Sequence, residues 1–203
     1  TPRARRVELM KAMLVHLRAM ADDIVALEMK ELGSPEFFAR ATHCNYQYER
    51  IESYISIAEK LELESEYAQS LVIREPVGVV ACITPWNYPL GQVVQKVIPA
   101  ILMGNTVVLK PSQHTPLTAC LLMEAFRLAG FPAGVVNMTS GRGSRLGDRL
   151  ATNPEVDMVS FTGSTKVGIA LSQKALESMK RISLELGGKS PYVWLPGMDD
   201  YRP

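Results

Sequence analysis

Apolar side chains recur at intervals of three and four residues along the first third of the chain. This spacing places them on one face of an α-helix, which predicts a stripe that packs against a core. The stripe begins at Val7, has a possible break near residues 22–23, and ends at Gly33. Ser34-Pro35-Glu36 then begins a second helix, whose apolar positions continue through Ala58. Residues 1–60 are therefore predicted to form a layer of N-terminal helices.

The pattern changes at residue 71, where short apolar runs begin to alternate with helical stretches. The expected strands are 71–74, 77–83, 106–110, 135–138, 156–161 and 181–184, with 192–195 as a last possible strand. The expected helices are 90–103, 115–129, a short one ending near Ala151 and one ending near Met179. Alternation of this kind, with Gly or Pro at the turns, predicts an α/β fold with a Rossmann-like, doubly wound parallel sheet. Residues 61–70 are acidic and irregular, and we interpret them as a link.

In such a sheet the strand-to-helix turns gather along one edge, which is where ligands bind. One of these turns, Pro85-Trp86-Asn87-Tyr88-Pro89, follows the predicted strand 77–83. The two prolines would hold the side-chain amide of Asn87 in one direction, and a fixed amide N–H is what an oxyanion site needs. Asparagine is also common in ordinary turns, so residue type alone favours the ordinary turn.

Two glycine-containing turns are candidates for a phosphate site. Phe161-Thr162-Gly163-Ser164-Thr165 joins a strand to a helix, whose N-terminal amides attract anions. A plain helix cap by Ser164 explains the same residues equally well. Gly141-Arg142-Gly143-Ser144-Arg145-Leu146-Gly147 has the context of a dinucleotide fingerprint, but its third glycine falls one residue late. Taken alone, that segment is better explained as a tight turn.

Two charged residues stand at the ends of predicted strands. Glu185 lies between two leucines and before Gly187-Gly188. An apolar setting disfavours the charged form of a carboxyl group, which suits a general base at neutral pH. Pairing with a neighbouring lysine is the structural alternative. Lys110 follows Val107-Val108-Leu109 and is either a cation that faces a ligand or a solvated strand end.

The composition excludes several classes of function. The chain has 203 residues, of which 47% are hydrophobic and 21% charged, and a formal net charge of +1, so nucleic acid and membranes are not expected partners. Its three cysteines are far apart, and no histidine lies at metal or triad spacing, so neither a disulfide framework nor a metal site is expected. No secretory signal follows the basic N-terminus, and the cytoplasm is the expected location.

Taken together and in order, the motifs are specific. They resemble the aldehyde dehydrogenase superfamily most densely from about residue 71 to 195. The residues that carry the resemblance are Glu75-Pro76-Val77-Gly78-Val79-Val80, Ile83-Thr84-Pro85-Trp86-Asn87-Tyr88-Pro89, Asn105-Thr106-Val107-Val108-Leu109-Lys110-Pro111-Ser112, Phe161-Thr162-Gly163-Ser164 and Leu184-Glu185-Leu186-Gly187-Gly188-Lys189-Ser190-Pro191.

The resemblance implies a role for each matched residue. Asn87 would donate its amide to the oxyanion of a thiohemiacetal, and Glu185 would activate the water that hydrolyses the thioester. Lys96 resembles a lysine that supports this site from behind. The cofactor would be NAD or NADP, with Lys110 at the adenosine ribose, Gly143 on the adenine side and the backbone of Leu186 beside the nicotinamide. The implied cofactor-binding residues are Ile83, Thr84, Pro85, Trp86, Lys110, Gln113, Gly143, Thr162, Gly163, Ser164 and Leu186.

Two positions depart from the family's usual pattern. Gln113 stands where many NAD-specific members carry a glutamate that binds both ribose hydroxyls. A carboxylate would repel a 2′-phosphate and a neutral amide would not, so we expect NADP to be tolerated as well as NAD. Gln92 and Gln95 share a helix face with Tyr88 by the substrate, where known members are often apolar, which favours a polar or hydroxylated aldehyde.

The resemblance also places the family's nucleophilic cysteine beyond residue 203, because none of Cys44, Cys82 and Cys120 matches its motif. We therefore expect this chain to contain the N-terminal helices (1–60) and a dinucleotide-binding domain (61–203) that is incomplete at its C-terminus. The catalytic and oligomerisation domains would be absent, and the chain alone would not oxidise aldehydes. The parent protein would be a homo-oligomer, either a dimer or a tetramer. The alternative is a non-catalytic nucleotide-binding or structural paralogue.

Overall fold

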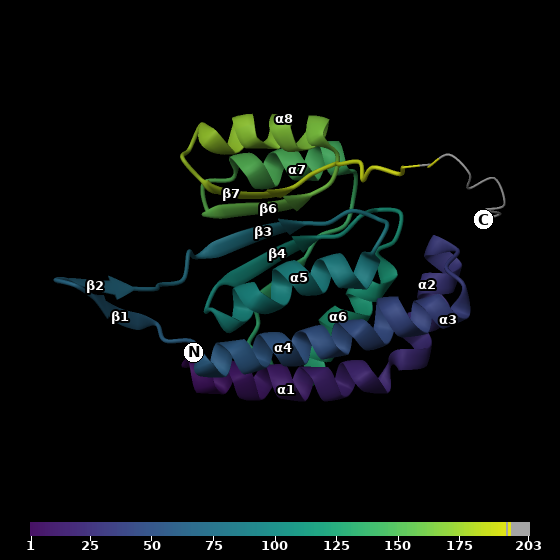
Figure 1. Ribbon diagram of the computed structural model, residues 1–203, viewed down its shortest axis with the longest axis horizontal. Coiled ribbons are helices and arrows are strands. Elements are labelled where there is room, and N and C mark those ends of the chain that lie inside the picture. The colour runs from purple at the N-terminus through teal and green to yellow at the C-terminus, as the bar shows by residue number, and fades with distance from the viewer. Residues whose placement is uncertain (194, 196–203) are drawn as a thin grey trace.

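Five parallel strands form the centre of the computed structural model, which describes residues 1–193 and 195 (Figure 1). The strands are β3 (Val79–Ile83), β4 (Thr106–Lys110), β5 (Val136–Met138), β6 (Met158–Thr162) and β7 (Arg181–Glu185). Their order in the sheet is β5-β4-β3-β6-β7. The chain thus builds outward from β3 to β5, returns past β3, and builds outward again through β6 to β7. The predicted doubly wound parallel sheet is confirmed.

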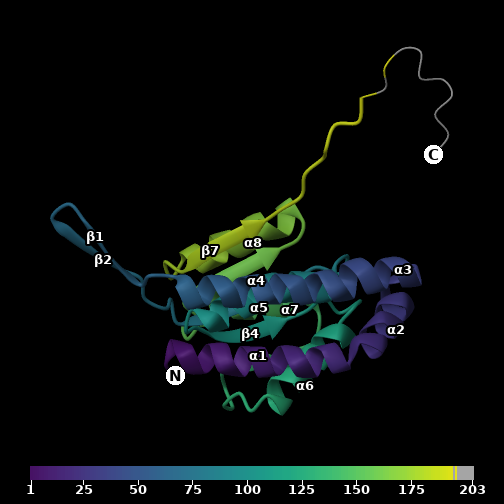
Figure 2. The ribbon, with the colours of Figure 1, turned by 60° about the horizontal axis from the view of Figure 1, so that its bottom comes forward.

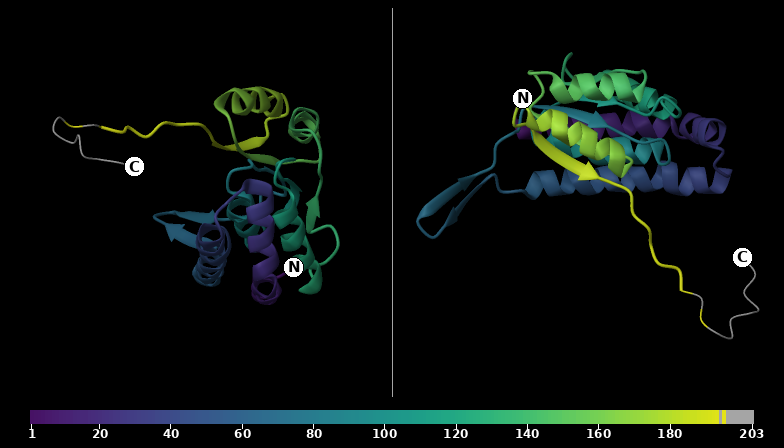
Figure 3. Two further views of the ribbon diagram at one scale, coloured as in Figure 1. Left: turned by 90° about the vertical axis from the view of Figure 1, so that its right-hand side faces the viewer. Right: turned by 90° about the horizontal axis from the view of Figure 1, so that it is seen from above.

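Helices cover both faces of this sheet, as the end-on view shows (Figure 3). One face carries α5 (Pro89–Leu102) and α6 (Leu117–Leu128), with α1 (Arg3–Ala19) and α4 (Tyr46–Lys60) packed outside them. The other face carries α7 (Gly143–Thr152) and α8 (Thr165–Leu176). Along β3, Val80 and Cys82 join the larger core, whereas Ala81 and Ile83 join the smaller one. Burial on both faces explains why this strand reads as a continuous apolar run.

The N-terminal helices follow the predicted stripe closely. The first break falls at Met20, between α1 and α2 (Ala21–Leu32), and Gly33 ends α2 with a left-handed φ of 74°. A side chain at that φ would be strained, so glycine suits the position. The second helical segment consists of α3 (Glu36–Phe38), a π-helical stretch η1 (Ala39–Asn45) and α4.

The predicted irregular link is wrong. Residues 61–74 contain an antiparallel hairpin made of β1 (Glu64–Tyr67) and β2 (Ser70–Ile73), which projects from the body of the protein (Figure 2). The expected strand 71–74 therefore pairs with β1 and does not extend the parallel sheet. Its side chains at Leu71, Val72 and Ile73 are exposed, so no burial pattern marks the hairpin in the sequence. The two segments satisfy their backbone hydrogen bonds locally.

The expected last strand at 192–195 does not form over its described residues 192, 193 and 195. Trp194 and residues 196–203 lie outside the described residues. Among the helices of the described part, none is long and apolar enough to cross a membrane.

Candidate functional site

A cleft of about 550 Å³ opens at the carboxyl ends of β3, β4 and β6. β3 and β6 are neighbours in the sheet, with Ile83 opposite Phe161, and they mark the point where the strand order reverses. Open α/β sheets bind ligands at such a switch point. The sequence-predicted cofactor residues that line the cleft are Ile83, Thr84, Pro85, Trp86, Lys110, Gln113, Gly143, Thr162, Gly163 and Ser164. Turns that are far apart in the sequence thus meet at one place.

Two buried hydroxyl groups belong to residues in the wall of the cleft. The Oγ1 atoms of Thr84 and Thr162 are buried, and neither has a hydrogen-bond partner among the described residues. A buried hydroxyl without a partner costs about 1–3 kcal/mol. Because both residues line the cleft, a polar ligand there could satisfy both groups.

The turn after β6 is shaped for an anion. A Cβ atom at Gly163 would come within 2.5 Å of the Phe161 ring, so only glycine fits without a shift. The Gly163 amide donates to the carbonyl of Glu185 (3.0 Å), which ties the turn to β7. Ser164 caps α8, since its Oγ accepts from the amide of Val167 (3.4 Å). The cap is confirmed, and because Ser164 and Val167 line the cleft, the N-terminus of α8 lies beside it, where an anion would be stabilised.

Lys110 is not a solvated strand end. Its side chain is only 3% exposed, and Nζ donates to the carbonyl of Pro111 (2.9 Å). Burial lowers the pKa of this ammonium group. The cleft lining holds Lys110 and Arg142 and, among the described residues, no carboxylate. The electrostatics therefore favour an anionic ligand, and the pattern of orphan hydroxyls, amides and cations fits a phosphate-bearing nucleotide.

Several lining residues were missed by the sequence reasoning. Ser112 and His114 flank Gln113 in the loop after β4, and Arg142 and Ser144 flank Gly143 at the start of α7. Phe161 at the end of β6 and Val167 of α8 complete the set. Their only sequence signal is adjacency to a predicted residue. Whether each flanking side chain reaches the cleft depends on loop geometry, which the motifs do not specify.

The turn that carries Asn87 follows β3 directly. Trp86, Asn87 and Tyr88 are all exposed. The turn is anchored on one side, because Thr115 donates its hydroxyl to the carbonyl of Trp86 (3.0 Å). It is anchored on the other side by the ring of Tyr88, which lies on that of His43 with centroids 5.1 Å apart. The residues on both sides of Asn87 are therefore anchored, and Asn87 itself is exposed to a ligand.

Glu185 is exposed at the end of the edge strand β7, so the apolar surroundings expected for it are not formed by the described residues. The physical reason is that an edge strand is covered on one side only. Leu186 does not line the cleft, and instead packs against α8, where a Cβ atom at Gly168 would lie 2.4 Å from its side chain.

Lys96 of α5 lies close to the neighbouring strands β3 and β6. Its Nζ donates to Ser160 Oγ (3.1 Å), and burial lowers its pKa while the charges of Cys82 and Glu185 act in the opposite direction.

The cysteines offer no activated thiol. Cys44 and Cys82 are buried, and burial raises the pKa of Cys82 to about 12. Cys120 is exposed, but partial burial and the charge of Glu31 also raise its pKa. A nucleophilic cysteine needs a lowered pKa. Within the described residues, no group of three or more His, Cys, Asp or Glu side chains is placed to hold a metal ion.

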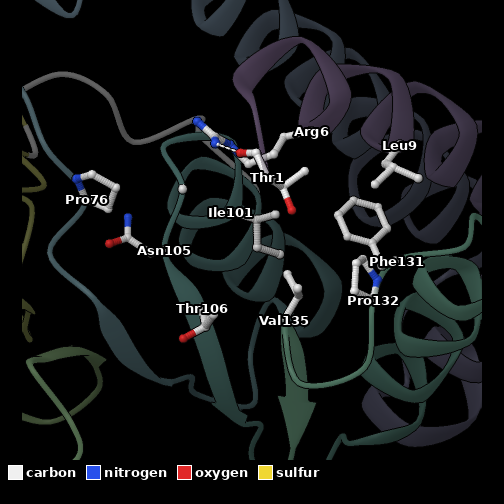
Figure 4. A pocket seen from close by; sticks show the side chains of 11 residues that line it. Thr1, Arg6, Leu9, Pro76, Ile101, Asn105, Thr106, Phe131, Pro132 and Val135 are labelled. Carbon is white, nitrogen blue, oxygen red and sulfur yellow. Dashed lines mark hydrogen bonds between the residues drawn. The ribbon is translucent and has the colours of Figure 1, made fainter.

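A second cavity, of about 330 Å³, lies at the opposite ends of the strands (Figure 4). It is lined by Arg6, Asn105 and Phe131 among others, and by none of the predicted site residues. Arg6 Nε donates to the carbonyl of Leu102 (2.9 Å), so this arginine ties α1 to the end of α5. These contacts are structural, and the cleft at the switch point remains the candidate site.

Comparisons with known proteins agree with the geometry. The model of the aldehyde dehydrogenase family matches residues 1–201. A variant of aldehyde dehydrogenase C from Pseudomonas syringae, solved with NAD+ and octanal, is similar with a TM-score of 0.92 and 36% identity over 97% of this chain and 40% of that one. The NAD-dependent aldehyde dehydrogenase of Sinorhizobium meliloti gives a TM-score of 0.89 and 40% identity over 94% and 39%. An NADP-dependent enzyme of Escherichia coli gives 0.86 and 34% over 93% and 40%.

The chain spans about two fifths of the length of the curated relatives it matches, 41% and 38% for the first two. The matched part is the one that holds the sheet, its helices and the cleft. With a family match over residues 1–201, the chain belongs to the aldehyde dehydrogenase family.

Proposed function

We propose that this chain binds NAD or NADP in the cleft at the switch point, as the nucleotide-binding part of an enzyme that oxidises an aldehyde to a carboxylic acid. The observation that carries the proposal is the pair of buried hydroxyls of Thr84 and Thr162. Within the described part of the chain they lack partners, and the cleft that these residues line contains no carboxylate. When bound, the dinucleotide supplies the two-electron oxidant.

In this proposal, each part of the cleft contacts a different part of the dinucleotide. The turn at Gly163 and Ser164, with the N-terminus of α8, holds the pyrophosphate. Lys110 binds the adenosine ribose, and Gly143 lies on the adenine side. Ile83, Thr84, Pro85 and Trp86 form the wall that orients the nucleotide. The backbone of Leu186 lies outside the cleft and would border the nicotinamide where that end of the dinucleotide extends beyond it.

Calorimetric titration of the purified chain with NAD+ and with NADP+ tests the proposal. We expect saturable binding of both nucleotides. The proposal is refuted if neither NAD+ nor NADP+ binds at millimolar concentration while the chain shows a cooperative unfolding transition.

For the chemical steps we propose two residues. The amide of Asn87 donates to the oxyanion that forms when a cysteine thiolate adds to the aldehyde, and this interaction is strongest at the charge that develops in the transition state. Glu185 accepts a proton from the water that hydrolyses the thioester. Lys96, within electrostatic reach of Glu185, supports that carboxylate.

The thiolate itself comes from outside the three cysteines of this chain, because Cys82 and Cys44 are buried with raised pKa values and Cys120 lies on α6 with a raised pKa. We therefore propose that the isolated chain does not oxidise aldehydes. The measurement is NADH absorbance after mixing the chain with NAD+ and an aldehyde. Turnover in the ordinary range of about 1–1,000 per second would contradict this proposal.

We propose that the cleft accepts NADP as well as NAD. Gln113 is exposed at its rim, and Arg142 is the exposed cation of the lining. The Gln113→Glu variant places a carboxylate near the ribose and should weaken NADP binding about tenfold, or ~1.4 kcal/mol, relative to NAD. Equal effects on the two nucleotides, measured by calorimetry, would show that Gln113 does not face the ribose.

For the substrate we propose a polar or hydroxylated aldehyde. Gln92 and Gln95 lie on α5, one and two turns after Asn87, and Gln95 is exposed. Beside them, Gln47 of α4 packs against Gly91 and accepts from Arg50 (3.1 Å), whose guanidinium also lies over the Tyr46 ring. Gln47 is buried and its amide is already bonded, so the proposal rests on Gln92 and Gln95, whose amides suit hydrogen-bonding substrates. A higher kcat/KM for octanal than for a hydroxylated aldehyde, in the enzyme that carries this sequence, would exclude the proposal.

We also propose a division of the chain into two parts. Residues 1–60 act as a packing layer for the nucleotide-binding part, 61–203, with which they share the larger core. We also propose a cytoplasmic protein that assembles as a homodimer or homotetramer and does not bind nucleic acid or membranes.

A further inference from the structure

A buried acid and a buried imidazole face each other behind the turn that carries Asn87. Glu28 of α2 and His43 of η1 are each only 1% exposed. Their Oε2 and Nδ1 atoms are 3.5 Å apart, at the outer limit of a hydrogen bond. Neither residue belongs to the nucleotide cleft, and neither is part of the chemistry proposed above.

These polar groups are not otherwise satisfied. Both carboxylate oxygens of Glu28, Nδ1 of His43 and Oγ1 of Thr118 on α6 lack hydrogen-bond partners within the described chain. Buried acids are rare unless they are paired, because the charged form loses its hydration. The amide of Leu90 and the hydroxyl of Thr118 also act on the Glu28 carboxyl. Among these neighbours the imidazole of His43 is the group that can exchange a proton with it near neutral pH.

The same imidazole packs against Tyr88 in the turn that carries Asn87. Its ring lies between those of Phe38, at 5.4 Å and 71°, and Tyr88, at 5.1 Å and 31°. Tyr88 directly follows Asn87 and is the N-cap residue of α5, whose side chain makes no capping hydrogen bond. The orientation of the turn thus depends on the ring of His43 more than on a helix cap.

We propose that Glu28 and His43 are positioning residues for Asn87. Glu28 sets the orientation of the His43 ring, His43 supports Tyr88, and Tyr88 fixes the direction of the neighbouring amide. The inference rests on the proposed role of Asn87 as the oxyanion donor, and it adds a dependence of that amide on the proton held by the pair.

The surroundings bring the pKa of Glu28 close to neutral pH. Burial raises the pKa of Glu28 to about 7 and lowers that of His43. On α2 the charge of Glu31 adds to the rise, whereas the amide of Leu90 on α5 and the hydroxyl of Thr118 on α6 oppose it. On η1, the thiol of Cys44 is the other titratable group within reach of Glu28. Loss of the shared proton changes which ring nitrogen of His43 carries hydrogen and hence its pairing.

NMR of the full chain tests the inference without NAD or aldehyde. The aromatic signals of His43 and Tyr88 and the side-chain amide of Asn87 are followed from pH 5 to 9. We expect all three to shift with one common midpoint near neutral pH. The amide of Asn137, which donates to the carbonyl of Gly134 (2.9 Å) on the far edge strand, should not move with them.

Two variants separate positioning from folding. Glu28→Gln should abolish the common midpoint and shift the Asn87 amide. The matched control Glu31→Gln alters a carboxylate one turn away, which accepts from the amide of Leu117 (3.1 Å). It should keep the common midpoint of the three signals and move it to lower pH, because the charge of Glu31 no longer raises the pKa of Glu28. His43→Phe keeps a ring against Tyr88 and should remove the pH dependence while retaining the folded spectrum.

The inference is overturned if the Asn87 amide in the parent chain does not follow His43, whether or not the variants fold. It is also overturned if Glu31→Gln and Glu28→Gln have equal effects on Asn87. Titration of NAD+ into the same samples reports on the proposed function separately, so that failure of nucleotide binding and failure of the positioning role are distinguishable.

Discussion

Replacing Thr84 by valine is expected to change stability and nucleotide affinity in opposite directions. Thr84 is 5% exposed, and its Oγ1 has no hydrogen-bond partner among the described residues. Valine has nearly the same shape but lacks the hydroxyl, so the free chain no longer buries an unsatisfied polar group. The two measurements therefore distinguish a hydroxyl that binds a ligand from one that stabilises the fold.

The magnitudes follow from general values for hydrogen bonds. An unsatisfied buried hydroxyl costs about 1–3 kcal/mol, so Thr84→Val should stabilise the free chain by about 1 kcal/mol. For a chain of this size that change raises Tm by about 2–4 °C. If the hydroxyl bonds to the nucleotide, its loss should weaken binding by about 1 kcal/mol, or roughly fivefold.

Thermal unfolding without nucleotide and calorimetric titration with NAD+ measure the two effects. Thr118→Val is the matched control for binding, because its hydroxyl is also buried with no close hydrogen-bond partner among the described residues, and it lies on α6 beside Glu28, outside the cleft. Its affinity for NAD+ should equal that of the parent. A Thr84→Val chain that is less stable than the parent and binds NAD+ normally would refute the assignment of this hydroxyl to the ligand.

Three further changes test other parts of the structure. Gly163→Ala puts a methyl group 2.5 Å from the Phe161 ring, so we expect a loss of about 1–3 kcal/mol in urea unfolding and weaker NAD+ binding, and parental values for both would contradict the close approach. Asn105→Ala removes the acceptor of the amides of residues 77 and 78 (2.7 and 3.0 Å) and should cost about 3 kcal/mol, whereas a change below about 0.5 kcal/mol would show that water replaces it. The folded state holds the proton of Glu28 to about pH 7 instead of 4.5, so parent stability should fall relative to Glu28→Gln by up to about 3 kcal/mol as pH rises through this window. Urea unfolding at pH 5 and 8 measures this difference, and equal differences at both values would disprove the shift.

Much of the nucleotide site could be predicted from local sequence. The run Val79–Ile83 is apolar at every position, which suits a central strand buried on both faces. Gly163 and Ser164 mark a turn and a cap by their own chemistry, and the structure forms both. Once these turns are assigned to a doubly wound sheet, the topology alone brings them to one edge.

Other features depend on contacts between distant segments. The hairpin β1–β2 has exposed side chains on β2, and its pairing is not marked by apolar alternation. Arg142, before α7, lines the same cleft as Ser112 and Gln113 of the loop after β4. Neither the hairpin nor Arg142 has a local sequence signal that distinguishes it from an ordinary surface segment or residue.

Local sequence indicated the alternation of strands and helices from residue 79 to 185, the parallel sheet, the glycine turns and the family, but not the hairpin β1–β2. These properties follow from backbone preferences and side-chain periodicity, which act over a few residues. Only the tertiary structure decided that Glu185 is exposed on an edge strand, that Leu186 packs on α8, and that Glu28 and His43 are buried together behind Tyr88. Burial and pairing of charged groups depend on which helices pack against each other, and that choice is made by the whole core.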